Sequence, residues 1–296
     1  MINAKETDKR LREAIIDILC YSAVFETALS DEEILWYIPV KASQVGVRSH
    51  LEKLLKRGKI KRLKNKKYGL ASISYKSQAA RQKQLAQRLE KAQKWSRLFR
   101  FLPFVKSILV SSDDLFYTKK PSSNSHYIFI TLPNRIYITK ACLYYALELL
   151  GKRRNTKNQK DSIFLDNFYT TAGLKFEDKM GNSSQAQVMW FMLAQPVYGK
   201  DVWLNILKNN PLIYKSLPNY PWKHQNTKIL TGFSRRLDSL DNLGYRRHLR
   251  HIADKPSLQS KTAFLRIRPD TLIARPSHSQ KLDEIKSRYS QIRSAI

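Results

Sequence analysis

The first seventy residues alternate apolar faces and polar breaks in an order that predicts short helices. Leu11, Ile15 and Leu19 recur at helical spacing, which predicts a first helix with one buried face. Ser30 is followed three residues later by Glu33, the spacing of a capping box. An apolar run comes directly after this pair, so a second helix is expected to begin at Ser30.

A third helix and a hairpin are predicted next. Leu51 and Leu54 share one helical face, and Gly58 follows as a helix terminator. Two short basic strands are then expected around a turn at Asn65. Helix, helix, helix and hairpin is the order of a winged helix-turn-helix, which we therefore expect over residues 1–74.

Strand and helix patterns alternate in the rest of the chain. Residues 75–102 predict one long helix with basic side chains all around it, and the runs FVKSILV and YIFI predict strands. Residues 138–150 predict an amphipathic helix. A helix-like pattern over residues 233–251 is interrupted at Gly244, where a break is expected.

These patterns predict an α+β protein with a mixed sheet and a mostly helical C-terminal region. The segment that ends at Trp222 is rich in Pro and aromatic residues, so we expect an irregular packed stretch there. The expected sections are a winged helix at 1–74, a basic linker helix at 75–102, a mixed-sheet domain at 103–220 and a basic C-terminal region at 221–296.

Charge changes this picture most. The chain has 54 Lys and Arg against 24 Asp and Glu, a formal net charge of +30. Such an excess opposes compaction unless a polyanion relieves it, and binding to phosphates releases counterions. Nucleic acid is therefore the expected partner, alone or within a larger nucleoprotein complex. A membrane surface is disfavoured because no helix pairs a bulky apolar face with a purely basic one.

The basic residues cluster in three places. Nine of them, and no acid, lie between Lys53 and Lys67, and Arg48 and His50 are expected beside them, off the apolar face of the third helix. The second cluster is the loop KRRNTKNQK, and the third is the second half of the 233–251 pattern. The residues expected to contact nucleic acid are Arg48, Lys53, Arg57, Lys59, Lys61, Arg62, Lys64, Lys66, Lys67, Lys152, Arg153, Arg154, Arg246, Arg247 and Arg250.

Each cluster also has a plainer interpretation as a solvated surface. His248 and His251 have a spacing that can bind metal on one helix face, but no third ligand follows, so no metal is expected. Cys20 and Cys142 lie in apolar helical patterns and are expected to be buried free thiols. Without a signal peptide or an apolar run of about 18 residues, a cytoplasmic protein is expected.

Several stretches together resemble a known family. The stretches are ILCYSAVFETALSDEEILWYI, the basic helix at 81–94, FLPFVKSILVSS, LLGKRR and the RPSH segment. In this order they are similar to bacterial proteins that fuse a winged helix to a nucleotidyltransferase-like domain of the DNA polymerase beta superfamily. The resemblance implies a nucleotidyltransferase-like fold for residues 103–220.

The resemblance also implies where a catalytic site would lie. That superfamily carries a Gly-Ser turn and, about ten residues later, an Asp-x-Asp pair that holds divalent metal. Here the turn falls on Ser112 and Asp113, and the acidic pair falls on Asn124 and His126. Asn is a weaker magnesium ligand and His suits other metals. Residues 115–130 contain no acid, so the loss does not depend on the alignment register.

The sequence therefore predicts a non-catalytic nucleic-acid-binding protein on a degenerate nucleotidyltransferase scaffold, without a cofactor. One alternative is an active nucleotidyltransferase that uses magnesium through a rearranged carboxylate site including Asp166. Another is an adaptor that docks its winged helix on protein within a nucleoprotein assembly.

Overall fold

The protein is an α+β protein with two compact units. The computed structural model describes residues 4–63, 66–75, 78–102, 104–110, 125–152, 163–171, 192, 194–222, 236–253, 264–268, 271–275 and 287–296. The first unit comprises Met1–Gln84, Pro211–Lys223 and Leu282–Ile296, and the second comprises Leu85–Asn210 and His224–Lys281. Two segments expected in later sections, 211–223 and 282–296, thus belong with the first unit.

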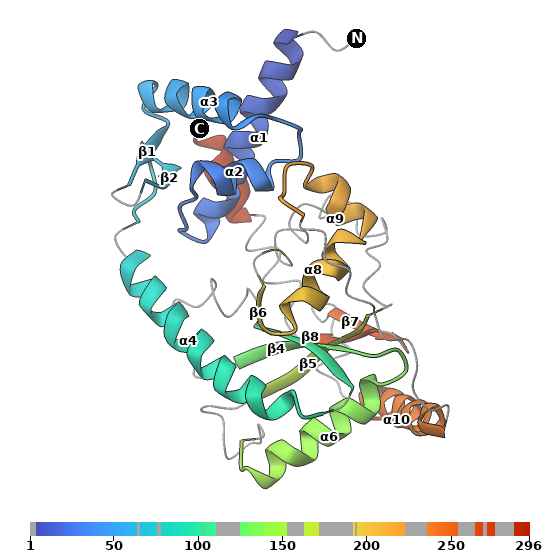
Figure 1. Ribbon diagram of the computed structural model, residues 1–296. Helices are drawn as coiled ribbons and strands as arrows, with labels where there is room; N and C mark the ends of the chain where they lie inside the picture. The colour runs from blue at the N-terminus through green and yellow to red at the C-terminus, as the bar shows by residue number, and fades with distance from the viewer. Residues whose placement is uncertain are drawn as a thin grey trace. The chain divides into compact units, whose positions relative to one another are not determined.

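The first unit contains three helices followed by a two-stranded hairpin (Figure 1). Its elements are α1 (Ala4–Val24), α2 (Asp31–Tyr37), α3 (Gln44–Lys56), β1 (Ile60–Arg62), β2 (Tyr68–Leu70) and α9 (Pro211–Ser216). β1 and β2 are antiparallel, with Ile60 opposite Leu70. Leu29, between α1 and α2, forms an isolated antiparallel bridge to Tyr68 of β2. The three predicted helices and the hairpin are confirmed.

Local sequence fixes these helix ends. The Ser30 side chain accepts a hydrogen bond from the Glu33 N–H, and the Glu33 carboxylate accepts one from the Ser30 N–H, so the predicted capping box is present. Ser43 caps α3 through Gly46 N–H. Gly58 follows α3 with a φ of +65°, a conformation that Gly adopts without a Cβ penalty.

Residues 211–222 pack within the first unit and are partly helical. α9 precedes a turn in which the Asn219 side chain accepts from Ala42 N–H and donates to the Val40 carbonyl. Tyr220 lies 5.9 Å from Trp36 and 4.5 Å from Trp222 between ring centroids. The expectation of a wholly irregular stretch was wrong, because the first half forms a helical turn that buries Ile213.

The second unit is built on a six-stranded mixed sheet with the order β6-β3-β4-β5-β8-β7. Its elements are α4 (Gln78–Phe99, from Leu85 onward), β3 (Val105–Val110), β4 (Ser125–Thr131), α6 (Ile136–Leu149), β5 (Ile163–Thr170), β6 (Gln195–Tyr198), α8 (Lys200–Lys208), α10 (Arg236–Ala253), β7 (Phe264–Arg268) and β8 (Thr271–Arg275). β4 and β5 are parallel and the other pairs are antiparallel. A parallel pair needs a crossover, and α6 lies on that connection.

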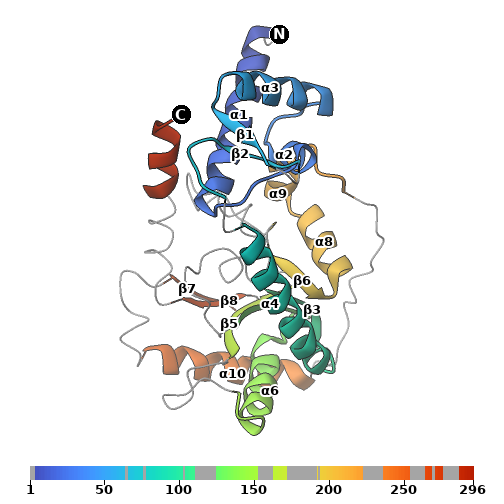
Figure 2. The same cartoon turned by 90° about the vertical axis from the view of Figure 1, so that its left-hand side faces the viewer.

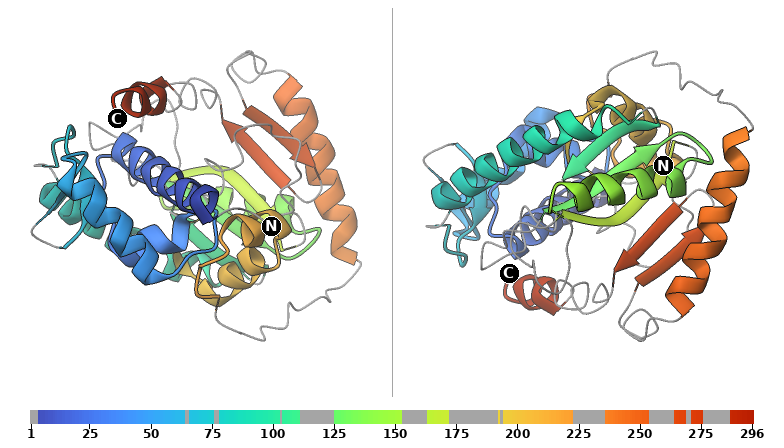
Figure 3. Two further views of the ribbon diagram at one scale, coloured as in Figure 1. Left: turned by 90° about the horizontal axis from the view of Figure 1, so that it is seen from above. Right: turned by 90° about the horizontal axis from the view of Figure 1, so that it is seen from below.

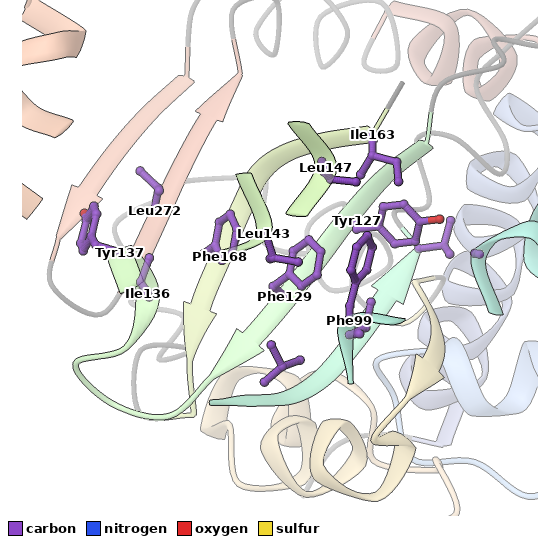
Figure 4. Close-up of a cluster of buried hydrophobic side chains, with 14 residues drawn as sticks. Phe99, Tyr127, Phe129, Ile136, Tyr137, Leu143, Leu147, Ile163, Phe168 and Leu272 are labelled. Carbon is purple, nitrogen blue, oxygen red and sulfur yellow. The ribbon is translucent and has the colours of Figure 1, made fainter. Parts of the chain in front are cut away.

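One face of the sheet holds an aromatic core (Figure 4). Tyr127 and Phe129 alternate along β4, so both point to this face. Phe99 of α4 packs edge-on against both rings, and Phe168 of β5 stacks on Phe129 at 5.1 Å. Leu143 of α6 is fully buried in the same cluster. α6 and α10 lie on one side of the sheet, seen edge-on in Figure 2.

Helix α10 is continuous through Gly244, so the predicted break was wrong. A Cβ on Gly244 would lie 2.8 Å from Tyr137 Cβ, which shows that the glycine is there for close packing. Figure 3 shows α10 running beside the β7–β8 hairpin, which the sequence patterns did not predict. Cys20 is buried as expected, whereas Cys142 is exposed on the outer side of α6. Among the helices described, none is long and apolar enough to cross a bilayer.

Candidate nucleic-acid interface

Helix α3 has one buried and one exposed face. Val47, Leu51 and Leu54 are between 0% and 4% exposed and anchor the helix to the unit's core. The opposite face repeats at intervals of three and four residues, as one side of a helix must. Its exposed residues are Val45, Arg48, Ser49, Glu52, Lys53 and Lys56.

His50 does not belong to this exposed face, contrary to the expectation. It is only 4% exposed, and its Nε2 lies 3.0 Å from the Asp8 carboxylate of α1. A side chain enclosed in this way joins two helices and cannot reach a ligand. Lys56, which the set of expected contacts omitted, lies on the exposed face instead. Counting residues from the apolar positions of α3 would have identified it.

An acidic partner holds Arg48. Its Nε donates to Asp31 Oδ2 at 2.6 Å, while the Arg48 side chain stays 59% exposed. Partial burial of Asp31 acts to raise its pKa, but the hydrogen bond and positive charge of Arg48 act against burial, and the pKa lies below its usual range. The guanidinium of Arg48 is therefore oriented by α2 and still accessible to solvent.

The basic residues around the hairpin divide into two groups. Lys61 donates to the carbonyls of Ala71 and Ile73 at 3.1 and 2.6 Å, and Lys67 pairs with Glu33 at 3.0 Å. These two lysines brace the hairpin against its own unit.

The second group is more accessible. Arg57, Arg62 and Lys66 are exposed, and Arg62 lies over the Tyr68 ring with 5.9 Å between the guanidinium carbon and the ring centroid. Lys59 is exposed and donates to the Ile296 carbonyl at 2.7 Å. Lys64 lies outside the described residues. The exposed cations of α3 and the hairpin thus belong to one unit.

Helix α10 uses its two sides differently. On its packed side, Asp241 accepts a hydrogen bond from Ile138 N–H at 2.9 Å and another from Tyr137 N–H. Both groups lie in the first turn of α6, whose own N-cap residue Arg135 makes no capping hydrogen bond. Asp241 therefore caps α6 from a neighbouring helix.

The same side of α10 continues this contact with α6. Asp238 lies 2.5 Å from Arg135, whose side chain is 2% exposed. His248 packs on the Tyr137 ring at 5.9 Å and lies 3.4 Å from Lys140 Nζ. The side chain of His251 lies outside the described residues. His248 is therefore part of the α6–α10 packing.

The other expected basic contacts lie in the second unit. Arg246, Arg247 and Arg250 are exposed on α10, away from α6. Lys152 is exposed after α6, and Arg153 and Arg154 lie outside the described residues.

The positions implied for a catalytic site are described only in part. Ser112, Asp113 and Asn124 lie outside the described residues. His126 is in β4 and Asp166 is in β5. The parallel register changes between the pairs His126↔Phe164 and Ile128↔Asn167, so Asp166 falls at that irregularity in the backbone pairing. Among the described residues, no three His, Cys, Asp or Glu side chains gather as a metal site.

No protein-family model, curated protein or solved structure matches the chain.

Proposed function

We propose that the protein binds nucleic acid through the exposed face of α3 and the outward cations of the β1–β2 hairpin. The observation that carries this proposal is the division of α3 into a fully buried apolar face and an exposed face with Arg48, Lys53 and Lys56. Cations on a rigid, well-anchored helix are positioned to neutralise phosphates at fixed spacing.

The arrangement of the first unit supports the same proposal. The order α1, Leu29 bridge, α2, α3 and hairpin supports our interpretation of this unit as a winged helix-turn-helix. In helix-turn-helix proteins, one helix enters the major groove and neighbouring parts hold the backbone. The net charge of +30 makes a polyanionic partner favourable for the whole chain.

We also propose that this binding is non-catalytic and independent of magnesium, on a degenerate nucleotidyltransferase scaffold. Asn124 and His126 replace the acidic pair that the resemblance would require, and neither supplies the negative charge that holds magnesium against a triphosphate. Magnesium-dependent nucleotide transfer by the unaltered protein, abolished by Asp166→Ala, would instead support the rearranged active site.

Salt dependence of binding tests the electrostatic basis of this proposal. Fluorescence anisotropy with the full chain and labelled oligonucleotides should show affinity falling by roughly 10³-fold or more between about 50 and 200 mM salt, if six or more phosphates are contacted. Removal of magnesium at constant ionic strength should leave affinity unchanged. Affinity that is independent of salt would overturn the proposal.

A matched pair of variants tests whether nucleic acid binds at the α3 surface. Replacing Lys53, Lys56 and Arg57 by Gln should reduce the slope of log K against log salt by up to about 2.7, because each lost phosphate contact removes about 0.9. The control replaces Arg97, Lys200 and Lys215 by Gln, removing the same charges from exposed positions on α4, α8 and α9. Equal losses in both variants would show that net charge, and not the α3 surface, determines binding.

A further inference from the structure

The exposed face of α3 is not uniformly basic, and its exceptions follow one line. Val45, Ser49 and Glu52 are exposed at positions i, i+4 and i+7. Val45 is 77% exposed. A surface that only neutralised phosphates would gain nothing from a solvent-facing valine, and a carboxylate there would repel the same phosphates.

Glu52 is notable because potential partners are close in sequence. Arg48 and Lys56 each lie four residues away, a spacing at which opposite charges on a helix can pair. Within the described part of the chain, Glu52 makes no ion pair, and Arg48 pairs with Asp31 instead. The carboxylate of Glu52 is therefore available as an acceptor.

These side chains match the chemistry of base edges in the major groove. An apolar group contacts the thymine methyl, a carboxylate accepts from cytosine N4, and an arginine donates to guanine O6 and N7. Arg48 is held through Nε by Asp31, which orients the guanidinium plane while the two Nη groups carry donors suited to guanine.

The order of residues along α3 supports the same arrangement. Val45, Arg48 and Ser49 lie in its first half, the part of a recognition helix that contacts bases. Lys53, Lys56 and Arg57 lie at the other end, where backbone contacts are expected.

We infer that α3 reads base edges in the major groove of duplex DNA, with Val45, Arg48, Ser49 and Glu52 determining sequence preference. This inference rests on the proposed function and names duplex DNA as the nucleic acid that is bound. Duplex DNA is favoured over duplex RNA because the B-form major groove admits a helix, whereas the major groove of A-form RNA is too deep and narrow for side chains to read.

Selection from a random duplex DNA pool by the full-length protein tests this inference. The bound fraction should become enriched in a short sequence, and Glu52→Gln and Val45→Ala should each change the preference at one base pair by roughly ten- to hundredfold. Lys56→Gln should weaken binding to all sequences alike. All three positions are exposed, so each variant should fold, and circular dichroism of each variant checks this.

The outcomes separate the inference from the proposed function. Three results would overturn the inference that α3 reads base edges but leave nucleic-acid binding intact. They are equal binding to all duplex sequences, tighter binding to RNA or single strands, and an enriched sequence that does not change with Glu52→Gln and Val45→Ala. Failure to bind any nucleic acid at low salt would overturn both.

Discussion

Helices α3 and α10 look alike in sequence, since each is amphipathic and rich in basic residues, yet they are anchored by different means. The packed face of α3 is mainly apolar, with Val47, Leu51 and Leu54 almost completely buried. The packed face of α10 presents Asp238 and Asp241 to the start of α6. The exposed lysines of α3 are therefore available for a partner, whereas part of the charge on α10 holds the fold together.

The difference has an energetic consequence. Apolar anchoring tolerates loss of a surface charge, so cations on α3 should be removable at little cost in stability. Removing an acid from α10 takes a carboxylate away from a buried cation or from the N–H groups that it caps, which is costly. The comparison predicts opposite results for substitutions in the two helices.

The largest effect is expected at Asp238. Asp238→Asn keeps the shape of the side chain but removes the negative charge that pairs with Arg135, whose side chain is 2% exposed. We expect a loss of about 3 kcal/mol in unfolding free energy, at the low end for a buried pair because Asp238 is 35% exposed and solvent screens it. Denaturant titration measures this loss.

The exposed Glu90–Lys94 pair of α4 provides the control. Glu90→Gln should cost less than about 0.5 kcal/mol, the usual value for an exposed pair four residues apart on a helix. Similar costs for both variants would show that the Arg135–Asp238 contact contributes no more than a surface pair.

A smaller loss is expected when the cap of α6 is removed. Asp241→Ala leaves two N–H groups of α6 without their acceptor, and we expect a loss of about 2 kcal/mol, the upper value for a cap. Asp241→Asn keeps an oxygen acceptor and should cost less. Denaturant titration of both variants at neutral pH measures the difference, and equal costs would contradict the capping role.

The Asp241 cap should also give a pH signature. Burial raises the pKa of Asp241, although the two backbone hydrogen bonds act against it. The folded state therefore holds this proton more tightly than the unfolded chain, and stability should fall as pH rises from about 3.9, the unfolded value, through the raised folded pKa. Asp241→Asn should remove this contribution, and denaturant titration of the variant across the same pH range checks this. Carbon-detected NMR titration of the Asp241 carboxyl group in the unaltered protein can verify the raised pKa.

The sequence predicted α3 well because all the information needed is local. The apolar spacing of α3 and the glycine at position 58 act within a few residues, and the structure agrees with both. The same local rules failed at Gly244, where the deciding fact is the approach of Tyr137 from a helix about a hundred residues earlier. A glycine that breaks a helix and one that allows close packing look identical in sequence.

The sequence also predicted the candidate site only where the information is local. Exposure of Arg48, Lys53 and Arg57 follows from periodicity, but burial of His50 does not, since its partner Asp8 lies on a different helix. The bracing roles of Lys61 and Lys67 also depend on tertiary contacts. Side chains facing solvent along one helix can be inferred locally, whereas pairing between elements cannot.

Gly244→Ala tests the packing of α10 with an effect of intermediate size. Alanine should favour the helix by about 1 kcal/mol. Its Cβ, however, would lie 2.8 Å from Tyr137 Cβ, and overpacking of this kind costs about 1–3 kcal/mol. We expect a net loss near 1 kcal/mol by thermal or denaturant unfolding. A gain in stability would show that the glycine is not required for the approach of α6.

The smallest effect on stability, and the sharpest test of α3, is expected at Asp31. Burial acts to raise its pKa, but the hydrogen bond and positive charge of Arg48 lower it, so its contribution is present above about 3.9, the unfolded value, and is lost as pH falls through the folded pKa. The Arg48 side chain is 59% exposed, so Asp31→Asn should cost less than about 1 kcal/mol at neutral pH.

The Asp31→Asn variant should nevertheless change DNA binding, because Arg48 loses the contact that orients it. In the duplex selection, preference should weaken at the single base pair that faces Arg48, while the response to Glu52→Gln stays the same. Arg48→Lys should weaken preference at the same base pair, since an ammonium lacks the planar fork that matches guanine. Unchanged preference in both variants would mean that the Arg48–Asp31 pair stabilises the surface of the first unit without positioning a reading side chain.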